Sequence, residues 1–222
     1  MNNKYLKESI HWIFMLIPFI YLAVIYSSLP QEVPIHFNWK GDADDWADKT
    51  MLFLMPAGLN LLIYFLMLIV PSIDPKKRIQ EMGSKYFSFR LILTIFFSIL
   101  SVYLIYVTKE GSLENPNILV SLIGLLFIMM GNYFQTVRPN YFVGIRTPWT
   151  LENEQVWKKT HRLGGRIWVA GGAIIVLLGL LINSVTAMLI CFLGLILIMV
   201  LVPVVYSYME FRKNRFDQSV KE

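Results

Sequence analysis

The acidic side chains of one short stretch are the residues best suited to cation chemistry. Asp42, Asp44, Asp45 and Asp48 lie there, and carboxylate oxygens are the hard ligands that Ca²⁺ prefers. Their spacing differs from that of an EF-hand loop, whose terminal glutamate is missing. His36 stands alone nearby, which is too little for a zinc site. We therefore predict no metal site and no cofactor.

Residues for nucleophilic or acid–base catalysis are equally sparse. His161 follows Glu152 and Glu154, but no serine or cysteine near it forms a recognisable catalytic motif. Cys191 is the single cysteine and stands in an apolar run, so it can form neither an internal disulfide nor a thiolate metal site. We predict that the protein is not an enzyme and has no catalytic residues.

The acidic stretch is better explained by binding. Residues 29–50 interleave carboxylates with Phe37, Trp39 and Trp46. Negative charge attracts a cationic or amphipathic peptide over a distance, and exposed aromatic rings then provide contact area. The alternative is a loop that only fixes topology and rests its tryptophans on lipid headgroups. Composition alone leaves both readings open.

A second informative segment, residues 136–166, combines aromatic, glycine and basic residues. Thr150 is a plausible N-cap for a short amphipathic helix from Leu151 to Leu163, and Gly164 and Gly165 would permit a bend after it. The basic residues of this helix, Lys158, Lys159, Arg162 and Arg166, fall within one arc. Such a helix anchors to anionic headgroups or forms a docking surface for an acidic partner.

The elements that must position these segments are membrane spans. The chain of 222 residues is 56% hydrophobic and 16% charged, where a soluble protein is about 45–50% apolar and about 25% charged. Six apolar runs have spanning length: 10–28, 51–70, 89–108, 117–135, 167–182 and 185–208. We predict an all-α polytopic membrane protein, a bundle of six transmembrane helices with one short amphipathic helix on the inner face. Its domains would be an N-terminal half, residues 1–110, and a C-terminal half, residues 111–222.

Charge sets the predicted orientation. Of the 20 lysines and arginines, only Lys40, Lys49 and Lys109 lie outside when both termini are cytoplasmic, as the positive-inside rule requires. The net charge of +5 then reflects topology, so we expect no direct contact with nucleic acid.

Polar residues inside the spans bear on transport. The predicted spans carry no Asp, Glu, Lys or Arg near their centres, which disfavours the alternative of a small-solute transporter or channel. Asn60, Asn132 and Gln135 are the most polar interior residues, and Asn132 and Gln135 either bridge helices or line a path.

Two sets of residues resemble the SdpI family of bacterial membrane immunity proteins. The inner segment matches the family pattern at Asn140, Tyr141, Gly144, Ile145, Arg146, Thr147, Trp149, Thr150, Trp157, His161, Arg162 and Gly164. The outer segment matches at Pro30, Pro34, His36, Phe37, Asn38, Gly41 and Asp42, although the proline often found between that glycine and aspartate is absent.

This resemblance implies a multi-pass protein of the bacterial cytoplasmic membrane that gives resistance to a secreted, membrane-active peptide toxin. It also implies a receptor role, in which an ArsR-type repressor is held at the membrane. The lipid bilayer, the toxin and that repressor are the partners to expect. The outer toxin-binding residues would be His36, Phe37, Trp39, Asp42, Asp44, Asp45 and Trp46. The inner partner-binding or signalling residues would be Asn140, Gly144, Arg146, Thr147, Trp149, Trp157, His161 and Arg162.

Overall fold

The architecture is taken from a computed structural model of the chain. It describes residues 2–38, 41–75, 77–113 and 115–219, with side chains described within the range 6–216. Of the predicted binding residues, Trp39 lies outside the described residues.

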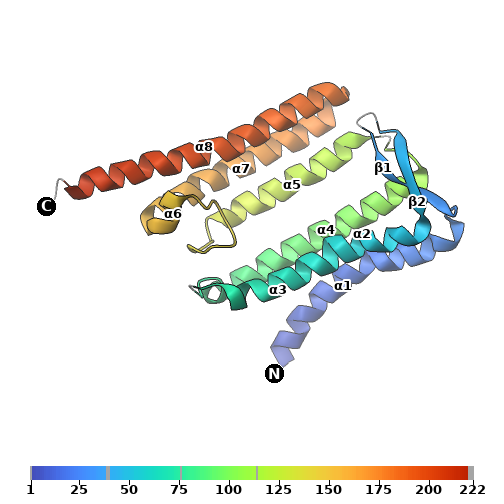
Figure 1. The fold of residues 1–222 in the computed structure, drawn as a ribbon, viewed down its shortest axis with the longest axis horizontal. Helices are drawn as coiled ribbons and strands as arrows, with labels where there is room; N and C mark the ends of the chain where they lie inside the picture. The colour runs from blue at the N-terminus through green and yellow to red at the C-terminus, as the bar shows by residue number, and fades with distance from the viewer. Residues whose placement is uncertain (1, 39–40, 76, 114, 220–222) are drawn as a thin grey trace. The chain divides into compact units, whose positions relative to one another are not determined.

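Within these described ranges, six helical segments are long and apolar enough to cross a membrane. They are α1 (Asn2–Ile25), a segment composed of η2 (Lys49–Phe53), α2 (Leu54–Pro56), η3 (Ala57–Leu62) and α3 (Ile63–Ile73), then α4 (Ser84–Glu110), α5 (Pro116–Phe134), α7 (Glu154–Leu181) and α8 (Val185–Ser219) (Figure 1). A turn at residues 182–184 separates α7 from α8, as predicted. The all-α fold with six spans is therefore confirmed.

The helices group into two compact units. The first comprises residues 1–69 and 87–119, and the second comprises residues 70–86 and 120–222. The segment between the second and third spans thus packs with the second unit. The predicted division into halves at residue 110 stays a prediction about domains.

In the first unit, a β-hairpin lies at one end of the helices (Figure 1). Strands β1 (Glu32–Phe37) and β2 (Ala43–Asp48) pair antiparallel, with register shifts between Pro34 and Phe37. Pro34 supplies no backbone donor, which is consistent with an irregular ladder. The sequence patterns do not predict the pairing of this segment into a hairpin.

In the second unit, glycines let α5 and α7 approach closely. A Cβ on Gly131 would lie 2.7 Å from the carbonyl oxygen of Gly165, and one on Gly165 would lie 2.6 Å from that of Gly131. Gly124 and Gly172 repeat the arrangement two turns away, at 2.9 and 2.6 Å. Small residues at such positions allow backbones to pack together in membrane helices.

The predicted short helix over Leu151–Leu163 is wrong. A five-residue helix, α6 (Pro148–Glu152), comes first, and α7 then runs unbroken from Glu154 to Leu181. Thr147 caps α6 and Asn153 caps α7, so Thr150 is not the N-cap. Gly164 and Gly165 do not bend the chain. They are small because neighbouring side chains and the backbone of α5 leave no room for a Cβ.

Candidate functional site

The hairpin is fixed to the neighbouring helices by apolar packing. Val33 on β1 is fully buried together with Leu22, Leu29, Leu52 and Ile105, which come from α1, the segment that follows it, η2 and α4. Burying such side chains contributes about 1.5–3 kcal/mol each. The hairpin therefore presents its outer residues from a packed base.

The turn of the hairpin is also held in place. Gly41 has φ +91°, a left-handed conformation that glycine adopts without strain, and its carbonyl accepts a hydrogen bond of 2.9 Å from the Leu113 amide. Asn38 and Asp42 bond each other across the turn through the Asp42 amide and the Asn38 side chain, at 3.1 Å. The backbone of Asp42 also forms an isolated antiparallel β-bridge with that of Ser112. Although it is exposed, Asp42 is thus part of the turn's own structure.

Asp48 is likewise structural. Its carboxylate accepts hydrogen bonds from the Thr50 amide at 2.9 Å and from Gln31 at 2.5 Å, and it caps η2. The backbone hydrogen bond from Thr50, with smaller contributions from the side chains of Thr50 and Gln31, lowers the pKa of Asp48 from its ordinary value. The stabilisation is therefore present at neutral pH, and it is lost as the pH falls through that lowered pKa.

Three other residues of the hairpin face outward. Asp44, Asp45 and Trp46 are exposed, and Trp46 retains 53% of its surface. His36 lies 2.5 Å from Asp44, Nδ1 to Oδ1, with both side chains in solvent. The structure thus places predicted residues from both strands on one hairpin, and Asp45 lies opposite His36 in the register.

The inner segment is a loop ordered by its own side chains. Asn140 is fully buried, and its side-chain oxygen accepts hydrogen bonds from the amides of Phe142 and Val143 at 2.8 and 2.7 Å. Its amide nitrogen donates to the carbonyls of Arg138 and Val143. One asparagine therefore shapes the turn that begins the loop.

His161 holds the next turn of the loop. Its Nε2 accepts a hydrogen bond of 2.9 Å from the Ile145 amide, and its Nδ1 donates to the Trp157 carbonyl at 2.9 Å. These partners assign the proton to Nδ1. Gly144, with φ +113°, passes so close to this ring that a Cβ there would clash with Nε2. His161 is thus a structural acceptor for the loop backbone.

Trp157 supports the histidine from the same helix. Its ring stacks on His161 with centroids 4.0 Å apart, and its Nε1 donates to the Val137 carbonyl at 2.8 Å. The side chain is fully buried. Burial means that Trp157 and His161 position the loop instead of offering their own surface to a partner.

Thr147 connects the loop to α8, and Thr150 holds the loop backbone. The Thr147 hydroxyl lies 3.1 Å from that of Ser207, and Thr150 donates to the Ile145 carbonyl at 2.9 Å. Arg146 donates to the Tyr141 carbonyl, and its side chain remains exposed. Arg162 is also exposed and Trp149 is half-buried. The predicted inner residues therefore separate into a buried frame and an exposed set.

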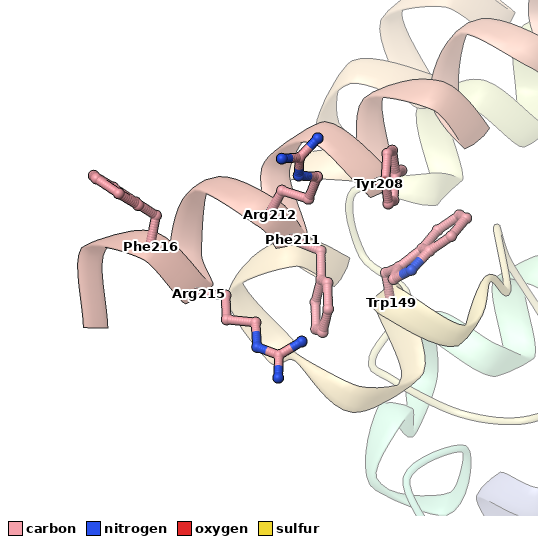
Figure 2. Close-up of a pocket in the computed structure, with 6 residues that line it drawn as sticks. All are labelled: Trp149, Tyr208, Phe211, Arg212, Arg215 and Phe216. Carbon is pink, nitrogen blue, oxygen red and sulfur yellow. The ribbon is translucent and has the colours of Figure 1, made fainter. Parts of the chain in front are cut away.

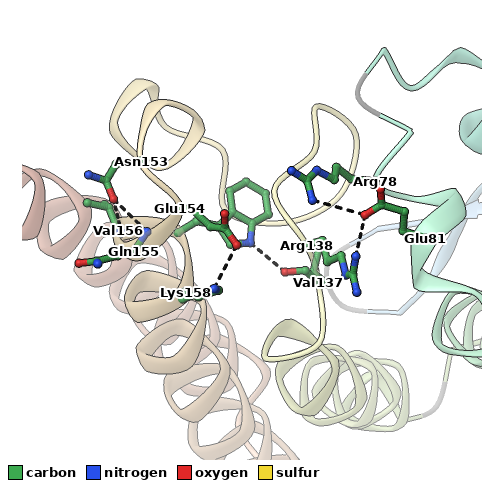
Figure 3. Close-up of polar contacts among 10 residues, drawn as sticks. Arg78, Glu81, Val137, Arg138, Asn153, Glu154, Gln155, Val156 and Lys158 are labelled. Atoms are coloured by element: carbon green, nitrogen blue, oxygen red, sulfur yellow. Dashed lines mark hydrogen bonds and ion pairs between the residues drawn. The ribbon is translucent and has the colours of Figure 1, made fainter.

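Beside this loop, charged groups border a cavity of about 410 Å³. Glu81 forms ion pairs with Arg138 at 2.6 Å and with Arg78 at 3.4 Å. Lys158 forms another with Glu154 at 3.0 Å (Figure 3). Each cation here already faces an acidic neighbour. Lys158, which sequence reasoning placed on a free basic face, is paired along its own helix.

A buried polar cluster in the first unit was missed. Arg90 of α4 contacts both carboxylate oxygens of Glu8 on α1, at 3.1 and 2.8 Å, and the Tyr64 hydroxyl donates to the same carboxylate at 2.6 Å. Arg90 retains only 7% of its surface. Nearby, His11 is fully buried, with Nδ1 2.9 Å from the Thr94 hydroxyl. Charge neutralisation within the cluster supports helix packing over a solute path.

Further polar side chains follow this cluster along one face of α4 and form a polar stripe. Ser98 donates to the Phe14 carbonyl and to Asn60, while the Asn60 amide donates to Ser101 at 3.1 Å. Asn60 therefore bridges helices. Its place in the π-helical segment η3 gives the second span an altered turn at this contact.

A pattern in the sequence could have indicated this stripe. Arg90, Thr94, Ser98 and Ser101 recur every three or four residues, which places them on one face of a helix. Within an apolar run, such a face marks contact with other helices and not with lipid. The partners on α1 could not be inferred, since Glu8 is far away in sequence.

Among the described residues, no group of three or more His, Cys, Asp or Glu side chains is arranged to hold a metal ion. The acidic hairpin residues are distributed between outward positions and structural hydrogen bonds. The hairpin is therefore better described as a charged surface than as a ligand cage.

Comparisons with known proteins find similar sequences. Residues 136–207 match the model of the SdpI/YfhL protein family, and residues 13–59 match a domain of unknown function, DUF1648. The immunity protein SdpI of Bacillus subtilis (strain 168) is 27% identical over 211 residues, which cover 93% of this chain and 97% of that protein. No solved structure matches. The first match spans the loop frame from Asn140 to His161 and its contact with Ser207, and it agrees with the resemblance to the SdpI family seen in this segment.

Proposed function

We propose that this protein is a membrane immunity protein that protects its cell against a secreted, membrane-active peptide toxin. The observation that carries the proposal is the similarity to an immunity protein over nearly the full length of both chains. The hairpin adds a physical basis, because it holds Asp44, Asp45 and Trp46 outward on a packed base. A cationic, amphipathic peptide is the ligand that such a surface attracts.

The proposal requires the hairpin to face the outside of the cell. The hairpin joins the first two spans, and the inner loop joins the fourth and fifth, so an odd number of crossings separates them. The concentration of lysine and arginine around the inner loop and both termini supports a cytoplasmic placement for that side. The hairpin would then meet a toxin as it arrives.

Replacing Asp44 and Asp45 together by asparagine is expected to reduce protection. Two exposed charges contribute about 0.3–0.5 kcal/mol each, so the toxin dose for half-survival should fall on the order of threefold. Raised salt screens the charges, so it should reduce the difference in half-survival dose between the variant and the unmodified protein. The measurement is survival of a sensitive bacterium that expresses each variant, challenged with supernatant of the species that carries this gene.

Glu110→Gln is the matched control for this test. It removes one exposed carboxylate at the C-terminal end of α4, outside the hairpin. This carboxylate pairs with Lys109 at 3.6 Å. Equal loss of protection in Glu110→Gln and in the aspartate variant, at equal membrane abundance, would argue for general surface charge and against capture by the hairpin.

We further propose that the exposed part of the inner loop holds a cytoplasmic ArsR-type repressor. Arg146 projects from a loop whose backbone is fixed by Asn140 and His161, and Arg162 is exposed on α7 beside His161. A rigid backbone that carries exposed arginines suits recognition of acidic groups, because little side-chain and loop freedom is lost on binding. The small-solute channel stays the alternative function.

Arg146→Ala is expected to lower repressor recruitment while protection persists. The guanidinium is exposed, so its removal leaves the loop folded, apart from the contact to the Tyr141 carbonyl. Recruitment is measured as membrane association of a fluorescent repressor from the same genome. Arg166→Ala, an exposed change on α7, is the control. A parallel fall of recruitment, survival and protein abundance would mean that Arg146 only supports the fold.

A further inference from the structure

A second cavity in the C-terminal unit combines two arginines with four aromatic rings. Trp149 of α6 and Tyr208, Phe211, Arg212, Arg215 and Phe216 of α8 border about 550 Å³ (Figure 2). Trp149 and Tyr208 have ring centroids 5.0 Å apart. The Arg212 guanidinium carbon lies 5.9 Å from the Tyr208 ring centroid, a cation–π distance. No acidic side chain is among these lining residues.

The position of this cavity along α8 matches the level of lipid phosphates. At about 1.5 Å per residue, Arg212 lies about 41 Å along the helix from Val185, where α8 begins. A bilayer is about 40–45 Å thick with its headgroups and about 30 Å thick without them. If Val185 lies near one surface, Arg212 reaches the opposite headgroup layer, and Tyr208 lies one turn deeper.

A separate apolar groove lies farther along α8, toward the middle of the span. It measures about 320 Å³ and is lined by Leu163 of α7 and by Leu201, Val202, Val205, Tyr206 and Met209 of α8. Leu201, Val205, Tyr208 and Arg212 recur every three or four residues, so they follow one face of the helix. Leu201 and Val205 of the groove therefore lie on the same side of α8 as Tyr208 and Arg212.

We propose that the cavity and the groove together bind one anionic phospholipid. Arg212 and Arg215 hold the phosphate, because guanidinium forks match its oxygens. Trp149 and Tyr208 lie at the glycerol level, where amphipathic rings are favoured. One acyl chain occupies the groove beside Val205. A soluble acidic protein would use the arginines but could not fill a groove within the span.

The test uses the purified full-length protein in neutral detergent, with phosphatidylglycerol, phosphatidylcholine and free glycerol phosphate as probes. Binding is followed by native mass spectrometry and by the thermal unfolding midpoint. We expect phosphatidylglycerol to bind more tightly than the other two. Arg212→Gln and Arg215→Gln should each weaken it by about fivefold, since one basic side chain near an anionic surface is worth about 1 kcal/mol.

Lys213→Gln is the matched control, because Lys213 is exposed on the same helix turn and is not among the lining residues. Its affinity should change by less than about twofold. Equal losses in Lys213→Gln and the two arginine variants would overturn the site in favour of diffuse surface charge. All three positions are exposed, so the variants are expected to fold, which circular dichroism checks.

The groove is tested by Val205→Trp, which fills it from a position that is already 54% exposed. Long-chain phosphatidylglycerol should bind less well, and a short-chain form should be less affected. Binding of glycerol phosphate as tight as that of the lipid would show a free-phosphate site and overturn the proposal. Unchanged lipid binding in both arginine variants, with loss of a recruited cytoplasmic protein, would make the cavity a protein docking surface instead.

Discussion

Glu8→Ala is expected to lower the free energy of unfolding by about 3–5 kcal/mol, because it leaves the Arg90 guanidinium buried without its counter-charge. Arg90 is 7% exposed and forms its two side-chain hydrogen bonds of 3.1 and 2.8 Å with Glu8. The Tyr64 hydroxyl would lose its acceptor as well. The measurement is equilibrium unfolding in mixed detergent micelles.

The double variant Glu8→Leu with Arg90→Met distinguishes pairing from packing. Apolar residues of similar size often replace a buried ion pair without loss, so much of the stability should return. Glu154→Ala is the matched single change, because its pair with Lys158 at 3.0 Å is largely in solvent. We expect that variant to lose less than about 1 kcal/mol. Similar losses in Glu8→Ala and Glu154→Ala would contradict the buried position of the pair.

Trp157→Ala should have an effect of similar size on the second unit. Removing a fully buried tryptophan costs about 3–5 kcal/mol through lost burial and the cavity that remains. The Val137 carbonyl also loses its donor and His161 loses its stacking partner. We therefore expect membrane abundance, toxin protection and repressor recruitment to fall together, as measured by immunoblot and by the two activity assays.

Trp46→Ala is the control with the same chemical change on the exposed hairpin. It should alter unfolding by less than about 0.5 kcal/mol, as is usual for surface substitutions. If Trp157→Ala kept full abundance and lost only recruitment, the ring would be a direct contact for the partner, and the structural role assigned to it here would be wrong.

Sequence reasoning identified the spans because lipid imposes a simple requirement on them. Each span needs a long apolar run, and the run at 185–208 is recognisable without any knowledge of its neighbours. Local turn chemistry is also informative, because glycine favours turns that need a left-handed backbone, and Gly41 adopts φ +91°. These features depend on residues close together in the chain.

Features that depend on contacts between distant segments could not be predicted in the same way. Gly164 and Gly165 look like a bend in the sequence, yet they lie inside α7, where close neighbours exclude a Cβ. Glu8 and Arg90 look like flanking charges, yet each is the other's partner within the helices. The hairpin base at Val33 likewise depends on α4, through Ile105.

The glycine contacts between α5 and α7 limit how this part of the molecule can move. Gly131 meets Gly165 and Gly124 meets Gly172, so the two backbones touch at two levels in one register. Sliding by one residue would bring a side chain against a carbonyl at both levels, and packed interfaces of this kind have discrete arrangements. We therefore expect α5 and α7 to move together as one rigid body. A toxin signal that reaches α7 would have to displace α5 with it, or pass to α8, where Gly171 meets the flexible side chain of Met199.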